Sequence, residues 1–406
     1  MNAIERAAPG NVAEVGDLLA ACDAEGKKVV IVGGNTLSGM GFPAERDDVT
    51  LETTRLAGVE DYQPADLTLS ALGGTVLQSL SVLLAQHEQF VPFDAPRPQY
   101  ATLGGTLAAG WLGPRRHLYG RPRDYVIGST VVLADGTVAR AGGMVVKNVA
   151  GYDMSRLYVG SFGTLAVIVR ANLKTLASSR RARVFLARLP EGTRSRAFAH
   201  LAALKIRPAA AFWIEGFHQS VDGDEGDEGR MLILLETSNA LLERATRDLR
   251  SALGGAGVPE TRVVDAGARE SFQRVVDAYV ANLGERSVTY RFDVQAERFE
   301  ATVAGIAALA SNFGLRCETI LDLPNGDLIA RISALDMHAL GAKIERFDDA
   351  LHDAHPAARV IASEHAHRAY LRVWGSSPTS VEQMRALKMR FDPNRTLNPG
   401  RFVGGI

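Results

Sequence analysis

Residues 32–39 read VGGNTLSG and directly follow the apolar residues VVI at 29–31. Three more glycine-dense stretches follow: TLGGTLAAGWLG at 102–113, NVAGYD at 148–153 and GSFGTLAVI at 160–168. Glycine lets consecutive backbone N–H groups converge on an anion and lets the backbone approach a flat ring closely. A tight turn would explain any one stretch, but four in one region indicate an extended ligand that contains a pyrophosphate.

An NAD site of the Rossmann type is the nearest alternative. Such a site needs a GxGxxG sequence that runs from a strand directly into a helix. After Gly41, Pro43 and the four charged residues at 45–48 disfavour a helix. We therefore expect a loop, and not a helix N-terminus, to meet the phosphate groups.

The periodicity of apolar residues around these stretches predicts an α+β fold. It predicts helices over 11–25 and 75–86, strands over 28–32 and 67–72, and a hairpin at Asp135-Gly136. From about Arg180 a different pattern begins, with strands near 209–216, 230–236, 287–293, 315–321 and 327–333. We expect one region over 1–175, a cap with a mixed or antiparallel sheet over 176–355, and a C-terminal segment over 356–406 that contains a helix near 381–391.

The composition of the chain limits which partners and cofactors we expect it to bind. The 45 Lys and Arg residues nearly balance the 46 Asp and Glu residues, so the sequence predicts no nucleic-acid partner. Cys22 and Cys317 lie far apart without CxxC spacing, which argues against a disulfide framework or an iron–sulfur site and favours the cytoplasm. No run approaches the ~20 apolar residues that span a bilayer, so we expect no direct membrane insertion and membrane association only through partner subunits.

The glycine stretches, PFDAPRPQYATLGGTLAAG at 92–110 and FDPNRTLNPGR at 391–401 resemble the flavin-binding segments of the vanillyl-alcohol oxidase superfamily. This resemblance implies a PCMH-type FAD-binding domain of two α/β subdomains, an α/β cap on the substrate side, and a C-terminal segment that returns to the flavin. GWLGPRRHLYGRPRDYVIG at 110–128 and VVKNVAGYDMSRL at 145–157 resemble the FAD-binding E subunit of bacterial glycolate oxidase more than its catalytic D-type relative.

The same resemblance implies which residues bind FAD. Gly33, Gly34, Asn35 and Thr36 would hold the pyrophosphate, Thr102, Gly104, Gly105 and Thr106 would line the ribityl region, and Gly160, Gly163, Thr164 and Ile168 would face flavin or adenine, with Asn398 near the isoalloxazine. Val32, Leu37, Pro96, Leu103, Ala109, Gly110 and Tyr152 complete the predicted set. Because 32–41 and 92–110 contain no histidine or cysteine, we expect noncovalent FAD.

The sequence offers a loose set of catalytic residues. Oxidation of a 2-hydroxy acid needs a proton acceptor and a cation for the carboxylate. The run SEHAH at 363–367 resembles the Glu-His-Gly motif of catalytic relatives, so Glu364 and His365 are candidates, and Arg115 is the candidate carboxylate clamp. If this run is extended, His365 and His367 share a face. The relatives' second histidine segment corresponds to LPNGDLIARI at 323–332, which has no histidine, so no metal site is predicted.

The resemblance implies an FAD-binding subunit of a glycolate oxidase complex that oxidises glycolate to glyoxylate. Its expected partners are a second FAD-containing catalytic subunit, an iron–sulfur subunit and a small 2-hydroxy-acid substrate. Two alternatives remain open: a stand-alone FAD-dependent D-2-hydroxy-acid dehydrogenase with His365 as base, and a flavin-binding structural subunit without turnover of its own.

Overall fold

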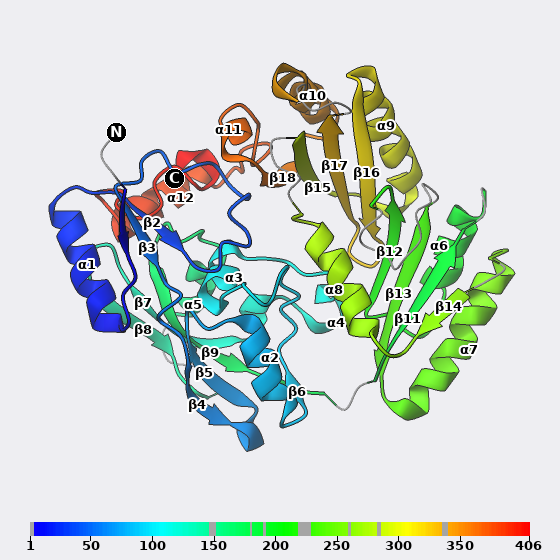
Figure 1. Cartoon of the computed structure of the whole chain (residues 1–406), viewed down its shortest axis with the longest axis horizontal. Coiled ribbons are helices and arrows are strands. Elements are labelled where there is room, and N and C mark those ends of the chain that lie inside the picture. Colours follow the sequence, from blue (N-terminus) through cyan, green and yellow to red (C-terminus); the bar gives the residue numbers. More distant parts are fainter. Residues whose placement is uncertain are drawn as a thin grey trace. The chain divides into compact units, whose positions relative to one another are not determined.

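The computed structural model describes residues 4–145, 152–178, 181–189, 192–217, 229–258, 261–281, 286–334 and 340–406. The chain divides into two compact units (Figure 1). Unit 1 comprises Met1–Gly113, Arg121–Ser178 and Ser376–Ile406, and unit 2 comprises Pro114–Gly120 and Ser179–Gly375. The first division lies close to the predicted boundary at 175, but residues 114–120 and 356–375 belong to unit 2.

Unit 1 contains a three-stranded parallel sheet of order β1-β3-β2 and a five-stranded antiparallel sheet of order β4-β5-β9-β7-β8. Its strands are β1 (Glu5–Ala7), β2 (Val29–Val32), β3 (Val49–Glu52), β4 (Val59–Gln63), β5 (Thr68–Leu72), β6 (Gln89–Phe90), β7 (Val126–Val132), β8 (Val138–Gly142), β9 (Val167–Lys174) and β10 (Leu176–Ala177). Its helices are α1 (Val12–Ala24), α2 (Leu77–Ala85), α3 (Leu103–Ala109), α5 (Ser155–Tyr158) and α12 (Val381–Phe391).

Helix α1 forms where the periodicity predicts it. The side chain of Asn11 accepts a hydrogen bond from the backbone N–H of Glu14 at 3.0 Å and so caps the helix. Val15, Leu19 and Cys22 recur at spacings of four and three and are buried in one core with residues of β2, β3, β7 and β9. The predicted hairpin at Asp135-Gly136 is also confirmed, since it joins β7 to β8 and Gly136 has a φ of 83°.

The stretch 102–113, which we expected to be a glycine loop, is helical over its first half. Thr102 caps α3 by accepting a hydrogen bond from the N–H of Gly105 at 3.3 Å. Leu103 and Leu107 are buried in the core beside β5 and β9. The burial of these leucines and the cap outweigh the low helix propensity of two consecutive glycines.

The C-terminal segment rejoins unit 1 and extends its parallel sheet. Leu397 forms a parallel bridge with Val29 of β2. The N–H of Val29 donates to the carbonyl of Thr396 at 2.7 Å, and the N–H of Asn398 donates to the carbonyl of Val29 at 2.9 Å. The predicted return of this segment therefore places residues 396–398 beside β2.

Unit 2 is built on one eight-stranded antiparallel sheet of order β14-β11-β13-β12-β16-β17-β15-β18. Its strands are β11 (Arg181–Arg188), β12 (Ala210–Glu215), β13 (Arg230–Thr237), β14 (Thr261–Val264), β15 (Ser287–Asp293), β16 (Leu315–Asp322), β17 (Asp327–Ala334) and β18 (Arg359–Ser363). Its helices are α4 (Arg116–Tyr119), α6 (Arg194–Ala202), α7 (Asn239–Gly255), α8 (Ala268–Ala278), α9 (Phe299–Asn312), α10 (Gly341–Ala354) and α11 (His365–Arg368). Strand β18 pairs with β15, which is why residues 356–375 join unit 2.

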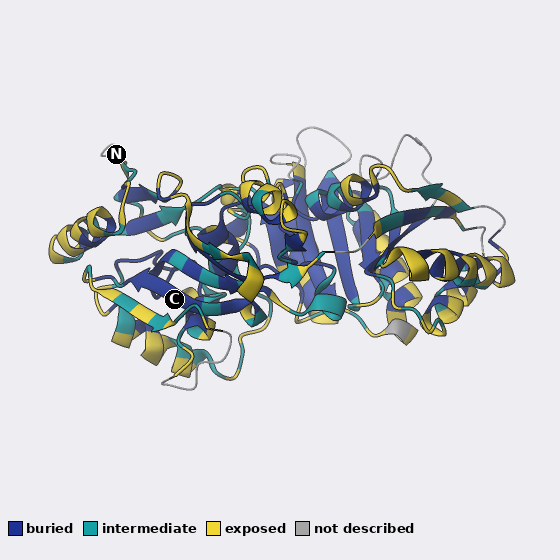
Figure 2. Cartoon of the chain, turned by 90° about the horizontal axis from the view of Figure 1, so that it is seen from below, coloured by how far each residue is buried: buried dark blue, intermediate teal, exposed yellow. Residues whose placement is uncertain are grey.

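Helices cover both faces of this sheet. Phe212 and Trp213 are consecutive in β12, so their side chains point to opposite faces. Phe272 of α8 stacks on Phe212, whereas Phe198 of α6 contacts the edge of Trp213. The strands of the sheet are accordingly mostly buried in Figure 2, and exposed residues lie on the surrounding helices and loops. Within the described residues, no helix is both long and apolar enough to cross a membrane.

Candidate functional site

A groove of about 810 Å³, its open mouth included, lies in unit 1. Four segments that are far apart in the sequence form it: the end of β2 with the loop after it, α3, the residues that lead into β9, and the C-terminal motif. The lining residues are Ile31, Val32, Gly33, Gly34, Asn35, Thr36, Leu37, Ser38, Thr53, Thr102, Gly104, Gly105, Thr106, Ala108, Ala109, Phe162, Gly163, Ala166, Val167, Ile168, Asn398 and Arg401. A groove formed by segments from such distant parts of the chain suits an extended organic ligand.

The glycines of the first loop let two walls of the groove lie directly against each other. A Cβ atom on Gly34 would lie 1.6 Å from the carbonyl oxygen of Tyr100, and one on Gly33 would lie 2.2 Å from Oγ1 of Thr102. These glycines therefore bring the loop after β2 against the start of α3, a packing role in addition to the expected approach to a ligand.

Left-handed backbone conformations gather around the groove. Asn35, Phe162 and Asn398 have φ values of 56°, 55° and 43°. Such values are uncommon for residues with a side chain and persist only where surrounding contacts hold them, often at functional sites. Gly163, next to Phe162, has a φ of 67°, and a Cβ atom there would lie 2.7 Å from Nδ2 of Asn398.

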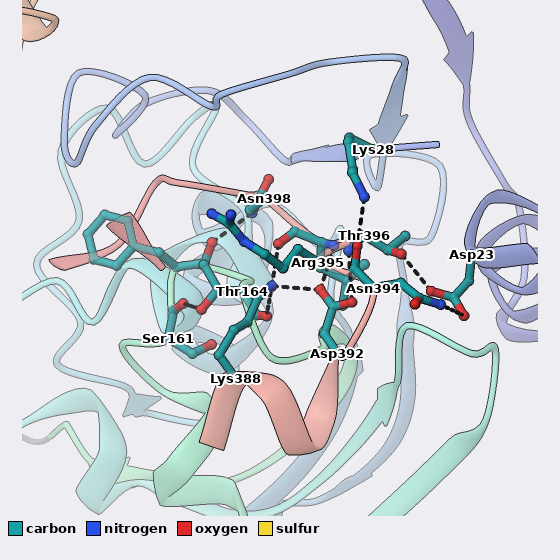
Figure 3. A network of polar contacts seen from close by, with 12 residues as sticks. Asp23, Lys28, Ser161, Thr164, Lys388, Asp392, Asn394, Arg395, Thr396 and Asn398 are labelled. Carbon is teal, nitrogen blue, oxygen red and sulfur yellow. Dashed lines mark hydrogen bonds and ion pairs between the residues drawn. The ribbon is translucent and has the colours of Figure 1, made fainter. Parts of the chain in front are cut away.

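Asn398 joins two walls of the groove through its side-chain amide (Figure 3). Its Oδ1 accepts a hydrogen bond from the N–H of Ile31 at 2.9 Å, and its Nδ2 donates to the carbonyl of Phe162 at 2.7 Å. The residue is 3% exposed. Its position in the groove agrees with the sequence prediction, but its amide is committed to the protein backbone and fixes the walls.

The hydroxyl of Thr106 is buried at the wall of the groove. The residue is 2% exposed, and Oγ1 has no hydrogen-bond partner among the described residues. A buried hydroxyl without a partner costs stability, so such a group at a groove wall indicates a ligand atom. Glycines and residues with hydroxyl groups line the groove together with the apolar Ile31, Ala109 and Ile168, and this mixture fits a ligand such as FAD that is part anionic and part flat and apolar.

The remaining predicted FAD residues lie outside the set that lines the groove. Pro96 and Leu103 are buried, Thr164 is buried with its Oγ1 donating to the carbonyl of Ser161, and Tyr152 is 92% exposed. Gly110 and Gly160 pack closely, since a Cβ atom on Gly110 would lie 2.8 Å from Cα of Gly160. Residues 148–151 of the NVAGYD stretch lie outside the described residues.

Several lining residues were missed from the sequence. Thr53 follows β3 and has no glycine beside it, whereas Arg401 directly follows Gly400 and ends the closing motif but was not among the predicted residues. Phe162 lies between Gly160 and Gly163, so the GSFG stretch gave its only signal. Ile31, Ser38, Ala108, Ala166 and Val167 are neighbours of predicted residues.

The catalytic candidates Glu364 and His365 lie in unit 2. The run 363–367 is not extended: β18 ends at Ser363, Glu364 is the N-cap and His365 begins the short helix α11. His365 and His367 therefore do not share a face as they would in a strand. Nδ1 of His367 is buried without a partner among the described residues, and the part of the chain that the structure describes contains no group of three or more His, Cys, Asp or Glu placed to hold a metal ion.

Arg115, the third catalytic candidate, binds a carboxylate of its own unit. Its Nη1 donates to Oε2 of Glu236 at 2.9 Å, and the hydroxyl of Tyr119 donates to the same oxygen at 3.0 Å. Burial would raise the pKa of Glu236, but Arg115, with help from Arg269, lowers it below the ordinary value. Arg115 therefore anchors the segment 114–120 in unit 2.

The Arg115–Glu236 pair gives a pH-dependent prediction. The pKa of Glu236 is lower in the folded chain than the ordinary 4.5 of a glutamate, so its stabilising effect is complete above about pH 4.5 and is lost as pH falls through the folded pKa. We expect Glu236→Gln to cost about 3 kcal/mol at pH 7, since it removes the buried carboxylate that Arg115 binds. In urea unfolding from pH 7 to pH 3, the difference in unfolding free energy between wild type and variant should become smaller only below about pH 4.5. A difference independent of pH would contradict this assignment.

Known proteins resemble both the groove region and the whole chain. Residues 6–153 match the family described as FAD binding domain. Glycolate oxidase subunit GlcE of Escherichia coli (strain K12) is 39% identical over 153 residues, which are 37% of this chain and only 43% of that protein. Glycolate oxidase subunit GlcD of Bacillus subtilis (strain 168) is 26% identical over 97% of this chain and 88% of its own length, and D-lactate dehydrogenase of Archaeoglobus fulgidus is 27% identical over 97% and 90%.

Solved structures of low identity share the fold. p-Cresol methylhydroxylase with substrate bound has a TM-score of 0.74 at 13% identity, covering 98% of this chain and 88% of that chain. Alkyldihydroxyacetonephosphate synthase has a TM-score of 0.69 at 14% identity, covering 97% and 75%. The predicted α+β class with a PCMH-type fold is confirmed, as is FAD as the cofactor. The chain thus contains an FAD-binding domain over residues 6–153 in a PCMH-type fold, and it is similar over nearly its whole length to oxidoreductases of 2-hydroxy acids.

Proposed function

We propose that the chain holds FAD noncovalently in the unit 1 groove and serves as the FAD-binding subunit of a complex that oxidises glycolate to glyoxylate. The observation that carries the proposed location of FAD is the buried hydroxyl of Thr106, which has no hydrogen-bond partner among the described residues and lies in a groove lined by several glycines. The similarity to glycolate oxidase subunits GlcE and GlcD supports the substrate class. A second FAD-containing catalytic subunit and an iron–sulfur subunit are the proposed partners.

Each wall of the groove has a distinct task in this proposal. The backbone of Gly33 to Thr36 and the hydroxyl of Thr106 would bind the pyrophosphate and ribityl groups, while Asn398 holds β2 and Phe162 at a fixed separation. Bound FAD would accept the hydride, which carries the two electrons, that a 2-hydroxy acid loses on oxidation, while the hydroxyl proton goes to a base. Ile168 and Ala109 would exclude water from the flat ring.

Noncovalent binding is tested by denaturing the purified yellow protein and precipitating it with acid. We expect the flavin to remain in the supernatant as intact FAD, because the segments 32–41 and 92–110 offer no histidine or cysteine for attachment. Flavin that stays with the precipitated peptide would contradict the proposal.

Thr106→Val should have opposite effects on the free and the FAD-bound protein. The methyl group replaces a hydroxyl that has no partner among the described residues, so the stability of the apoprotein should stay constant or rise. FAD affinity should fall about tenfold, the loss of one hydrogen bond. Thr319→Val is the matched control, because Oγ1 of Thr319 is also buried and without a described partner but lies in unit 2, and FAD affinity should not change. Equal FAD affinity in Thr106→Val and wild type would argue against a contact between α3 and FAD.

A stand-alone D-2-hydroxy-acid dehydrogenase is the second candidate, favoured by the similarity to D-lactate dehydrogenase over 97% of the chain. Anaerobic glycolate and D-lactate should be mixed with the isolated FAD-loaded chain while flavin absorbance is followed. The subunit proposal predicts slow or no bleaching until the partner subunits are added. Rapid bleaching by either acid that His365→Ala abolishes would favour the second candidate, and full activity of a complex whose chain cannot hold FAD would favour a structural subunit.

A further inference from the structure

Helix α12 is held to unit 1 by a buried charge. Among its residues Lys388 is buried, at 2% exposure, whereas Leu387 and Met389 are 39% and 53% exposed. An amphipathic helix normally buries apolar residues and leaves its lysines in water. The arrangement here indicates that the ammonium group of Lys388 has a specific role.

All three N–H groups of this ammonium have acceptors (Figure 3). Nζ of Lys388 donates to the carbonyl of Thr164 at 2.7 Å, to the carbonyl of Leu397 at 2.8 Å and to Oδ2 of Asp392 at 2.6 Å. Burial lowers the pKa of Lys388, and the nearby carboxylate of Asp392 opposes that effect. A lysine offers three donors and no acceptor, so its hydrogen-bonding capacity is complete.

Asp392 links Lys388 to the backbone of the C-terminal motif. Its Oδ1 accepts from the N–H of Thr396 at 2.7 Å and its Oδ2 accepts from the N–H of Leu397 at 2.7 Å. Thr396 and Asn394 bind Asp23 of α1 through Oγ1 and Nδ2, at 2.6 Å and 3.1 Å. These contacts fix residues 394–397 against α1 and β2.

The two acceptor carbonyls of Lys388 belong to two different walls of the groove. Thr164 follows Phe162 and Gly163, and Leu397 precedes Asn398. The Asn398 amide joins the same two walls on the groove side, through the carbonyl of Phe162. Lys388 and Asn398 therefore form two parallel links between one pair of segments, and only Asn398 lines the groove.

We infer that Lys388 and Asp392 are a positioning pair that sets the separation of the residues 162–164 and 396–398 and thereby the affinity and environment of FAD. The inference rests on the proposed location of FAD in the groove, but not on the substrate. Lys388 acts through Thr164 and Leu397. Removing one partner of a purely stabilising buried pair would lower the stability of the protein but leave the environment of the bound flavin unchanged.

The test is Lys388→Met, which keeps a long, unbranched side chain and removes the charge and all three hydrogen-bond donors. FAD affinity is measured by titrating the apoprotein while the fluorescence of FAD is followed, and the environment of the bound flavin by visible circular dichroism. We expect a loss of affinity of about tenfold or more, with an altered flavin dichroism. If Lys388→Met does not fold, Lys388→Gln, which keeps a hydrogen-bond donor, is measured in its place, with a smaller loss expected.

The matched control is Asp348→Asn in unit 2, where Asp348 is 1% exposed and accepts from the hydroxyl of Tyr290 and the N–H of Arg372, each at 2.9 Å. It should lower the melting temperature without a change in FAD affinity or dichroism. Affinity within twofold of wild type in the lysine variant would overturn the inference. If Thr106→Val weakens binding and Lys388→Met does not, the positioning pair alone fails. If neither variant weakens the binding seen in wild type, the groove itself is not the FAD site.

Discussion

Gly34→Ala is expected to reduce FAD affinity by two orders of magnitude or more. The added Cβ atom would lie 1.6 Å from the carbonyl oxygen of Tyr100 and 2.5 Å from the carbonyl carbon, so backbone on one side or the other must move. Overpacking of this severity costs about 3 kcal/mol, which corresponds to about a hundredfold in a binding constant when the strain falls on the bound state. The displaced segment carries Thr102, the N-cap of α3, so both walls of the groove would shift together.

Isothermal titration of the apoprotein with FAD measures this effect. Gly143→Ala is the control, because a Cβ atom there would meet no heavy atom within 4 Å and the residue lies in the same unit. The control should bind FAD as wild type does. Wild-type affinity in Gly34→Ala would show that the loop after β2 is not a wall of the FAD site.

Asp327→Ala is expected to cost unit 2 about 3 to 5 kcal/mol of unfolding free energy. Asp327 is fully buried, and its Oδ2 contacts Nη2 of Arg116 at 2.8 Å and Nη2 of Arg291. Removing the carboxylate takes away a fully buried charge that both the buried Arg291 and the half-buried Arg116 contact. Asp293→Ala is the matched control, since Asp293 is 68% exposed and pairs with Arg359 at 3.5 Å, and it should cost at most about 0.5 kcal/mol.

Asp322 should reduce this loss in part. It lies opposite Asp327 in the β16–β17 hairpin, and burial, together with the charge of Asp327, raises its pKa to about 8. Without Asp327 the pKa of Asp322 should fall, and its carboxylate, 3.9 Å from Nη1 of Arg116, would become the remaining counter-charge. Guanidinium denaturation should therefore show that the double variant loses more unfolding free energy than Asp327→Ala and Asp322→Asn lose together. An additive result would contradict this account.

Local patterns predicted much of the fold, because the spacing of apolar residues fixes which face of an element is buried. The helix at 12–24 and the strands β12, β13, β15, β16 and β17 of unit 2 match the predicted ranges within a few residues, whereas β11 and β14 were not predicted. Helix α3 was missed because GG inside TLGGTLAAG argues for a loop, and the contacts that stabilise the helix come from distant strands. Residues 114–120 belong to unit 2. No local pattern could predict this, because the contact that holds them there joins Arg115 to Glu236, 121 residues away.

The candidate site was predictable only where glycine marks it. Gly33, Gly34 and Gly163 line the groove at close approaches that a side chain would block. Thr53 lines it with no glycine beside it, and in the sequence Lys388 is one more charged residue of an amphipathic helix. Its role depends on carbonyl groups of Thr164 and Leu397, which carry no information in the side-chain sequence.

Hydrogen–deuterium exchange of the purified chain with and without FAD tests the location of the cofactor most directly. The account predicts slower exchange on FAD binding in the backbone amides of residues 31–38, 102–109, 162–168 and 396–401, with unchanged exchange in β11 and β13 of unit 2. Protection absent from these four segments, or confined to unit 2, would contradict it.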